Sequence, residues 1–202
     1  MNSWNALEIC AGGGGQSLGL EQAGFELAAA VEIESIACET LRTNRPKWDV
    51  VEADVRDFDG SPYQGVDLLA GGVPCPPFSI AGKQLGANDE RDLFPTALRL
   101  TKEVHPKAVM LENVRGFSMP AFDGYRKNLF SEFEALGYQV QAKVLNSSNF
   151  GVPQLRPRWI MVALQTPLMR KFRWPDRRLA PLSVGESLRD LMAADGWLVR
   201  GR

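Results

Sequence analysis

Stretches with the pattern of β-strands alternate with stretches of helical pattern along most of the chain. Short apolar runs are followed by amphipathic runs that stop at Gly24, Pro46 or Gly137. This alternation predicts an α/β fold: a doubly wound, Rossmann-like sheet, mostly parallel, with helices on both faces. The last two strands are expected to pair antiparallel, as in a hairpin. The expected strands span residues 6–10, 27–31, 50–53, 66–70, 107–111, 139–145 and 159–164, and the expected helices span 17–23, 35–44, 93–104, 125–136 and 184–193.

Composition narrows the class of protein. A chain of 202 residues with 45% apolar side chains is long enough for one domain with a full core. Its three cysteines (Cys10, Cys38 and Cys75) are too few and too scattered for a disulfide framework or a zinc site, which favours a reducing compartment, the cytoplasm. No signal peptide is expected at the N-terminus, and no apolar run approaches the roughly 20 residues of a membrane span.

Charge is distributed unevenly along the chain. The overall net charge is -1, but the acidic residues concentrate before residue 150 and the basic ones after it. The basic end includes Arg170, Lys171 and Arg173, with Phe172 and Trp174 among them. Basic residues beside aromatic ones suit a polyanion with stackable bases. Taken alone, the segment is better interpreted as a solvated surface turn.

Chemically versatile side chains follow the expected strands. A glycine loop, residues 12–15, comes after the first strand, and Glu32, Asp54, Cys75 and Glu112 stand at the ends of the next four. Each alone could cap a helix or decorate a loop. Because ligands of doubly wound sheets bind beyond the carboxyl ends of the strands, the five together predict one ligand cleft.

The glycine loop and Glu32, about 20 residues later, fit a cofactor that carries a ribose. Glycines permit close backbone approach, and the acid can accept hydrogen bonds from ribose hydroxyls. NAD and S-adenosylmethionine satisfy the pattern equally well. Asp54, with Val55 beside it, would suit the edge of an adenine, since its carboxylate can accept from the exocyclic amine.

Cys75 lies between Pro74 and Pro76, after an apolar run and the pair Gly71-Gly72. We expect the glycines to let the backbone turn and the prolines to stiffen the residues after them. A thiol held in this way suits a nucleophile. On this stretch alone, a buried cysteine in a proline-rich turn explains the residues as well.

Four motifs together resemble the cytosine-C5 DNA methyltransferases. They are Pro74-Cys75, Phe78-Ser79, Glu112-Asn113-Val114 and Gln154-Leu155-Arg156-Pro157-Arg158. Their order and spacing match the family from about residue 7 to residue 164. The resemblance implies the sheet of an S-adenosylmethionine-dependent methyltransferase and DNA as the partner.

The resemblance also implies roles for individual residues. Cys75 would be the nucleophile, Glu112 would contact the cytosine ring, and Arg158 would hold the base with support from Arg156. The residues implied for S-adenosylmethionine are Cys10, Ala11, Gly12, Gly13, Gly14, Gly15, Glu32, Ile33, Asp54, Val55, Pro74 and Leu93. Those implied for DNA are Ser79, Lys83, Gln84 and Arg91, in a loop, residues 80–91, that would close over the nucleic acid.

The reaction itself requires such groups. Carbon 5 of cytosine is a poor nucleophile until a thiolate adds to carbon 6 and loads electron density onto it. The charge that reaches ring nitrogen 3 calls for an acid, the role expected of Glu112. A base inside a duplex must be flipped out of the stack to react, at a cost of a few kcal/mol. No step needs a metal.

Three departures from the family pattern qualify the resemblance. Cys10 stands where the family usually has an aromatic residue that stacks on adenine, and Pro76 stands where it most often has glutamine. The family's target-recognition region is not found within the 202 residues. We therefore expect a catalytic domain, residues 1–165, followed by a basic linker and short helix, residues 166–202. Either a second polypeptide supplies the missing region or the chain is truncated; the former predicts an exposed apolar face at 184–191.

Other functions stay open on the sequence alone. A related branch of enzymes methylates transfer RNA, and cytosine in RNA exposes the same reacting atoms. A non-catalytic module that binds the cofactor or DNA is a second alternative. An NAD-dependent oxidoreductase fits the glycine loop but leaves Cys75 and Glu112 without a role.

Overall fold

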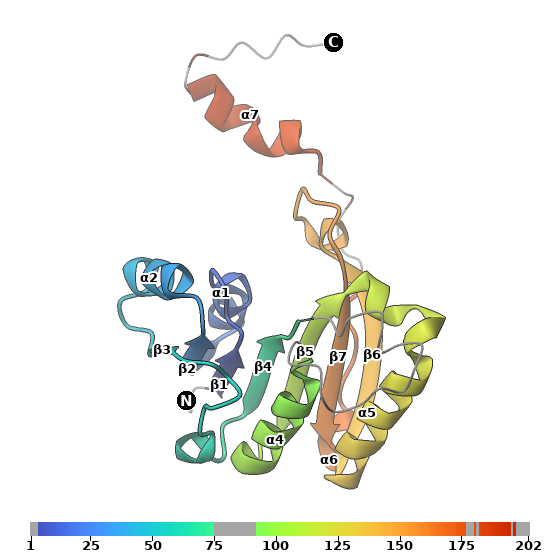
Figure 1. The fold of residues 1–202 in the computed structure, drawn as a ribbon. Helices are drawn as coiled ribbons and strands as arrows, with labels where there is room; N and C mark the ends of the chain where they lie inside the picture. The colour runs from blue at the N-terminus through green and yellow to red at the C-terminus, as the bar shows by residue number, and fades with distance from the viewer. Residues whose placement is uncertain (1–3, 75–91, 177–179, 181, 195, 197–202) are drawn as a thin grey trace.

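The computed structural model describes residues 4–74, 92–176, 180, 182–194 and 196. Its centre is a seven-stranded sheet with the order β3-β2-β1-β4-β5-β7-β6 (Figure 1). The strands are β1 (Trp4–Ile9), β2 (Phe25–Glu32), β3 (Val50–Glu52), β4 (Leu68–Gly72), β5 (Ala108–Val114), β6 (Tyr138–Asn146) and β7 (Pro157–Gln165). The α-helices are α1 (Gly15–Gln22), α2 (Ser35–Asn44), α4 (Phe94–Val104), α5 (Asp123–Ala135), α6 (Thr166–Met169) and α7 (Val184–Ala194), with short 3-10 turns at Ser61–Tyr63, Arg115–Ser118, Pro120–Phe122 and Ser147–Phe150.

The pairing of the strands confirms the predicted fold class. β1 pairs in parallel with β2 and β4, and β2 with β3 and β4 with β5 do the same. β7 runs antiparallel to both of its neighbours, β5 and β6. The sheet is thus parallel except for one inserted strand, and the last two strands form the expected antiparallel pair.

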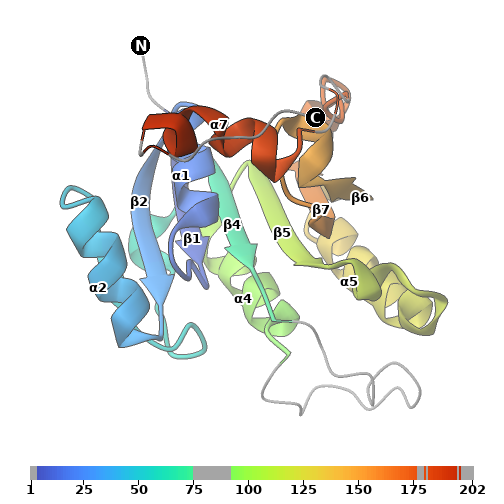
Figure 2. The same cartoon turned by 90° about the horizontal axis from the view of Figure 1, so that it is seen from above.

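Alternation along the central strands divides the core between the two faces. Leu7 and Leu69 join the larger cluster, which also holds Phe94 and Leu100 from α4 and Phe133 from α5. Their neighbours in sequence, the alanines and leucines of the other face, pack with Leu20 of α1 in a smaller cluster. Because successive residues of a strand point to opposite faces, helices α4 and α5 cover one face and α1 the other (Figures 1 and 2).

Two details differ from the sequence-based predictions. Gly71 and Gly72 continue β4 rather than turning the chain, because both pair with β5 and Gly71 also pairs with β1. Position 71 requires glycine, since a Cβ there would come 2.6 Å from Cγ1 of Ile9. Glu112 lies within β5 and not after it, since pairing with β7 extends that strand to Val114.

The stretch after β7 is more structured than expected of a linker. It begins with α6, whose Met169 is buried. α7 then extends away from the sheet, and no residue of this helix is buried (Figure 1). None of the described helices combines the length and hydropathy that crossing a bilayer requires. The division of the chain at residue 165 stays a prediction.

Candidate functional site

A cavity of about 250 Å³ opens at the carboxyl ends of β1 to β4. Seven of the residues predicted for the cofactor line it, each reaching it from a strand end or from the start of α4. They are Cys10, Glu32, Ile33, Asp54, Val55, Pro74 and Leu93. Three further lining residues, Val31, Ala53 and Arg56, were not predicted, although their sequence neighbours were. A cavity is therefore present at the edge of the sheet where the sequence predicts a ligand cleft.

The glycine loop supports this cavity from the side. The backbone N–H of Gly12 donates to Oε2 of Glu32 (2.6 Å), which joins the loop to the end of β2. Gly14 has a φ of 85°, and a Cβ there would come 2.5 Å from Cδ2 of Leu41. A non-glycine residue at position 14 would thus be both strained and crowded. Ala11, Gly13 and Gly15 complete the loop without lining the cavity.

Glu32 holds the loop and the strand end in place together. It is 7% exposed, and its Oε1 accepts from the backbone N–H groups of Ile33 and Glu34, each at 2.9 Å. With Gly12 on Oε2, three backbone donors therefore orient one carboxylate. Carboxylate oxygens can accept further hydrogen bonds, so a ribose hydroxyl can still be bound from the cavity side.

Asp54 is engaged by a neighbour that the sequence analysis overlooked. The Nε of Arg56 lies 2.9 and 3.0 Å from the two carboxylate oxygens of Asp54. Hydrogen bonds from the Arg56 side chain and backbone hold the pKa of Asp54 below its usual range. Asp54 is therefore an ionised acceptor at neutral pH, as a contact to an exocyclic amine requires. The position of Arg56, two residues after Asp54, was the feature of the sequence from which this contact could have been predicted.

Cys10 contributes a neutral wall. Burial, and then the charges of Glu32, Asp54 and Glu8, raise the pKa of its thiol to about 12. Since the thiolate is the reactive form, this cysteine cannot serve as a nucleophile near neutral pH. Its φ of 54° places the backbone in the left-handed region as the chain leaves β1.

Glu112 and Arg158 form an ion pair across strands β5 and β7. Val114 of β5 is in register with Arg158 of β7, so the arginine side chain reaches back along the strand. Its Nε lies 2.5 Å from Oε1 of Glu112, and both side chains are about three-quarters buried. A carboxylate and a guanidinium predicted to share one site therefore do so. Arg156 is exposed just before β7, with its backbone N–H bonded to Asn146.

Asn113 links the ion pair to the end of β4. Its side chain is 2% exposed, and its Nδ2 donates to the carbonyls of Val73 (3.2 Å) and Pro74 (3.5 Å). Gly72 is in register with Glu112, and a Cβ on Gly72 would lie only 3.6 Å from Oε2 of Glu112. The buried amide of Asn113 thus fixes Val73 and Pro74, the residues that follow β4, beside the strand that carries Glu112. Asn113 belongs to one of the sequence motifs, but no role was predicted for it.

Five predicted residues, Cys75, Ser79, Lys83, Gln84 and Arg91, lie outside the described residues, as does the expected loop 80–91. The chain reaches Cys75 directly after Pro74, which lines the cavity. The cavity, with two acidic acceptors and apolar walls, is therefore linked to the Glu112–Arg158 pair through the hydrogen bond between Pro74 and Asn113. The cavity can hold a nucleoside, and the Glu112–Arg158 pair can hydrogen-bond a second, planar polar group beside it.

Known DNA methyltransferases are similar to this chain over most of its length. The family model described as C-5 cytosine-specific DNA methylase matches residues 4–199. Type II methyltransferase M.NgoMIV of Neisseria gonorrhoeae is 57% identical over 96% of this chain and 62% of its own length. Type II methyltransferase M.NaeI of Lentzea aerocolonigenes is 54% identical over 98% of this chain and 48% of its own length.

Among solved structures, a prophage-encoded E. coli protein described as a DNA modification methyltransferase aligns with a TM-score of 0.77 at 27% identity. The alignment covers 92% of this chain and 54% of that one. The present chain thus spans 48 to 62% of the length of these three relatives.

Proposed function

The chain belongs to the C-5 cytosine-specific DNA methylase family, and on that premise we propose that it transfers a methyl group from S-adenosylmethionine to carbon 5 of cytosine in DNA. The observation that carries the proposal is the position of Pro74. This residue lines the nucleoside-sized cavity, is bonded through its carbonyl to the neighbour of Glu112, and directly precedes Cys75. The proposed donor pocket and the groups proposed to bind the base would thus meet at the end of β4.

The described residues fit S-adenosylmethionine. Glu32 would accept from the ribose hydroxyls, and the ionised Asp54 would accept from the adenine amine. The apolar side chains of Val31, Ile33 and Leu93 would cover the faces of the nucleoside. When bound, the sulfonium supplies an electrophilic methyl group. No aromatic residue lines the cavity among the described residues, so adenine would pack on aliphatic side chains and Cys10 instead.

Around cytosine, each group has a proposed task. Cys75, as the thiolate, would use its electron pair to form the S–C6 bond, and this would displace the C5=C6 π pair toward nitrogen 3. Glu112, in its neutral carboxyl form, would donate a proton to that nitrogen, and the resulting enamine would make carbon 5 nucleophilic. Arg158 would orient Glu112 through their ion pair and hold the base, with Arg156 at the rim. After methyl transfer, loss of the carbon-5 proton would let the bond to Cys75 break.

DNA binding is proposed to involve Ser79, Lys83, Gln84 and Arg91. Lysine and arginine would contact phosphates, and these contacts would offset the cost of taking the cytosine out of the stack. The basic segment after β7 would add to this electrostatic attraction. We place the reaction in a reducing compartment, the cytoplasm, in keeping with the few and scattered cysteines.

We further propose that recognition of the target sequence comes from a second polypeptide, and that residues 166–202 form the connection toward it. The exposed apolar side chains of Val184, Leu188 and Leu191 on α7, with exposed fractions of 56, 41 and 67%, support this proposal. Removing such side chains from water on binding would stabilise the assembly. Co-purification and titration with candidate partners would test it; a chain that methylates a defined site alone would contradict it.

The central test replaces the nucleophile. We expect Cys75→Ala to abolish transfer of tritiated methyl groups to DNA while the dissociation constant for S-adenosylmethionine, measured by calorimetry, stays within about twofold. Cys38→Ala is the control for loss of a thiol, because Cys38 is buried and does not itself line the cavity; its Sγ donates to the backbone carbonyl of Glu32 (3.5 Å), so the variant also shows how far donor binding responds to a change behind the lining. Retained turnover in Cys75→Ala would reject the proposal. Methylation of transfer RNA in place of duplex DNA, or cofactor binding without turnover in every assembly, would each reject part of it.

A further inference from the structure

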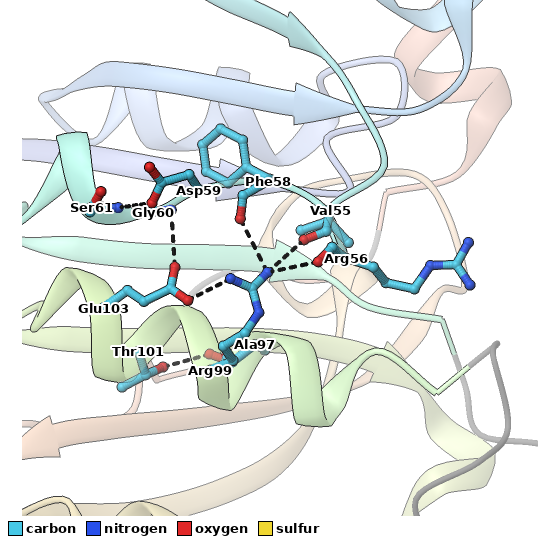
Figure 3. A network of polar contacts seen from close by, with 10 residues as sticks. All are labelled: Val55, Arg56, Phe58, Asp59, Gly60, Ser61, Ala97, Arg99, Thr101 and Glu103. Atoms are coloured by element: carbon cyan, nitrogen blue, oxygen red, sulfur yellow. Dashed lines mark hydrogen bonds and ion pairs between the residues drawn. The ribbon is translucent and has the colours of Figure 1, made fainter.

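Arg99 of α4 is hydrogen-bonded to the segment of residues 55–60, which begins in the lining of the cavity (Figure 3). The Nη2 of Arg99 donates to the carbonyls of Val55 (3.0 Å), Arg56 (3.2 Å) and Phe58 (3.2 Å). Its Nη1 lies 2.6 Å from Oε1 of Glu103, one helical turn further on. A single guanidinium thus binds three carbonyls of one short segment and is itself held by a carboxylate.

Glu103 holds the same segment at a second point. Its Oε2 accepts from the backbone N–H of Gly60 at 3.0 Å. Gly60 also packs tightly on α4, since a Cβ there would come 2.9 Å from Val104 and 3.0 Å from Leu100. The bonds of Arg99 and Glu103 therefore attach both ends of residues 55–60 to one face of the helix.

The position of this segment matters for the cavity, because the residues directly after β3, which ends at Glu52, form part of the lining. Ala53, Asp54, Val55 and Arg56 all line the cavity, and their backbone continues without regular sheet or helix until Ser61. Irregular backbone has few fixed hydrogen bonds of its own, so its position depends on the groups to which it is bonded. Leu93, directly before α4, lines the same cavity. The start of α4 thus places Leu93 in the lining, and its side chains Arg99 and Glu103 fix the segment after β3.

We propose that Arg99 is a positioning residue for the cofactor: it holds residues 53–56 where Asp54 and Val55 meet the adenine of S-adenosylmethionine. This inference rests on the proposed function for the identity of the ligand. It assigns a role in donor binding to a side chain that does not itself line the cavity. It also predicts that donor affinity is coupled to α4, so that a change confined to the helix alters binding at Asp54.

The test compares Arg99→Met with Arg42→Met in the full chain. Arg42 is a matched control: it extends from α2 to the strand that precedes the same segment, where it bonds Glu52 (3.1 Å) and the carbonyl of Val50 (3.1 Å). β3 is already fixed by its ladder with β2. We therefore expect Arg42→Met to leave the dissociation constant for S-adenosylmethionine within about twofold, and Arg99→Met to raise it by about tenfold or more.

A second measurement is independent of the cofactor. Hydrogen exchange, read by mass spectrometry on the chain without ligand, should accelerate at residues 53–60 in Arg99→Met and not in Arg42→Met. Arg99→Lys keeps the charge beside Glu103 but has no planar fork to reach three carbonyls, so it should restore little of the affinity. In an assembly with turnover, the Michaelis constant for S-adenosylmethionine should rise while kcat at saturation stays close to wild type.

The outcomes separate this inference from the proposed function. Unchanged exchange at residues 53–60 in Arg99→Met would overturn the positioning role. A lower melting temperature with unchanged donor affinity would also overturn it, because Arg99 would then only stabilise the fold. If the wild-type chain bound no S-adenosylmethionine, the proposed function would fail, while the exchange measurement would still decide whether Arg99 holds the segment.

Discussion

Glu112 and Arg158, 46 positions apart in the chain, meet across the antiparallel pair β5–β7, with Nε of the arginine 2.5 Å from Oε1 of the acid. The insertion of β7 between β5 and β6 makes the meeting possible, because an antiparallel strand returns the start of β7 to the end of β5. The same end of β5 adjoins the exit of β4 through Asn113. The one antiparallel strand of the sheet therefore completes the site.

Loss of the arginine should impair catalysis more than cofactor binding. In an assembly that shows turnover, we expect Arg158→Met to lower kcat by about 10²-fold or more, since Glu112 loses the group that orients it. The dissociation constant for S-adenosylmethionine should stay within about twofold, because Arg158 does not line the cavity. Single-turnover methyl transfer and calorimetry measure the two quantities. A kcat within about twofold of wild type would contradict the assigned role.

Loss of the acid at the end of β2 should have the opposite signature. Glu32→Ala removes the acceptor for three backbone N–H groups and the proposed acceptor for the ribose, so we expect the dissociation constant for S-adenosylmethionine to rise by about tenfold or more. Glu26→Ala is the control, because Glu26 is exposed on the same strand. Calorimetry on both variants gives the comparison. Equal affinities would show that the cavity does not bind the ribose through Glu32.

Substitution of two glycines by alanine, Gly71→Ala and Gly19→Ala, should change the free energy of unfolding in opposite directions. Gly71→Ala places a Cβ 2.6 Å from Cγ1 and 2.9 Å from the carbonyl oxygen of Ile9, so β1 and β4 must move apart. We expect it to lower the free energy of unfolding by about 1–3 kcal/mol. Gly19→Ala, exposed in α1 with open space around it, should raise that free energy by about 0.5–1 kcal/mol. Urea denaturation tests both, and a neutral Gly71→Ala would disprove the close approach of the strands.

A buried acid predicts a pH dependence of stability. Glu8 is 1% exposed, and burial raises the pKa of its carboxyl from 4.5 to about 7, although a hydrogen bond from Ser17 opposes the shift. Between these two values the folded state holds a proton that the unfolded state has lost. The contribution of Glu8 to the free energy of unfolding therefore falls as pH rises through this window, by about 3 kcal/mol in total.

Glu8→Gln should remove this dependence, since the amide does not titrate and can still bond Ser17. We expect the variant to gain stability relative to wild type between about pH 5 and pH 8, as measured by urea denaturation at both values. A difference between the two proteins that does not change with pH would show that Glu8 is ionised in the folded state, or that the site relaxes around it.

Local patterns were sufficient for the architecture and for most of the cavity. The alternation of strand and helix signals predicted every strand of the sheet, and the positions of Glu32 and Asp54 at strand ends predicted that these two share one cleft. These inferences succeed because periodicity and turn residues act over a few neighbouring positions, and because parallel strands end at a common edge. The glycine loop and Glu112, predicted for the same cleft, lie outside the lining of the cavity. The motif Glu112-Asn113-Val114 was expected just after the fifth strand, and it forms the last three residues of β5.

The contacts that hold the site together depend on tertiary structure. Asn113 bonds carbonyls 39 and 40 positions earlier, and Arg99 bonds carbonyls 41 to 44 positions earlier. Which carbonyls a long polar side chain reaches is decided by how helices and strands pack, to within about an ångström, and no local pattern encodes that distance. The sequence alone thus determined which residues stand at the edge of the sheet. Only packing decided which of them touch, and that β1 leaves no space for a side chain at Gly71.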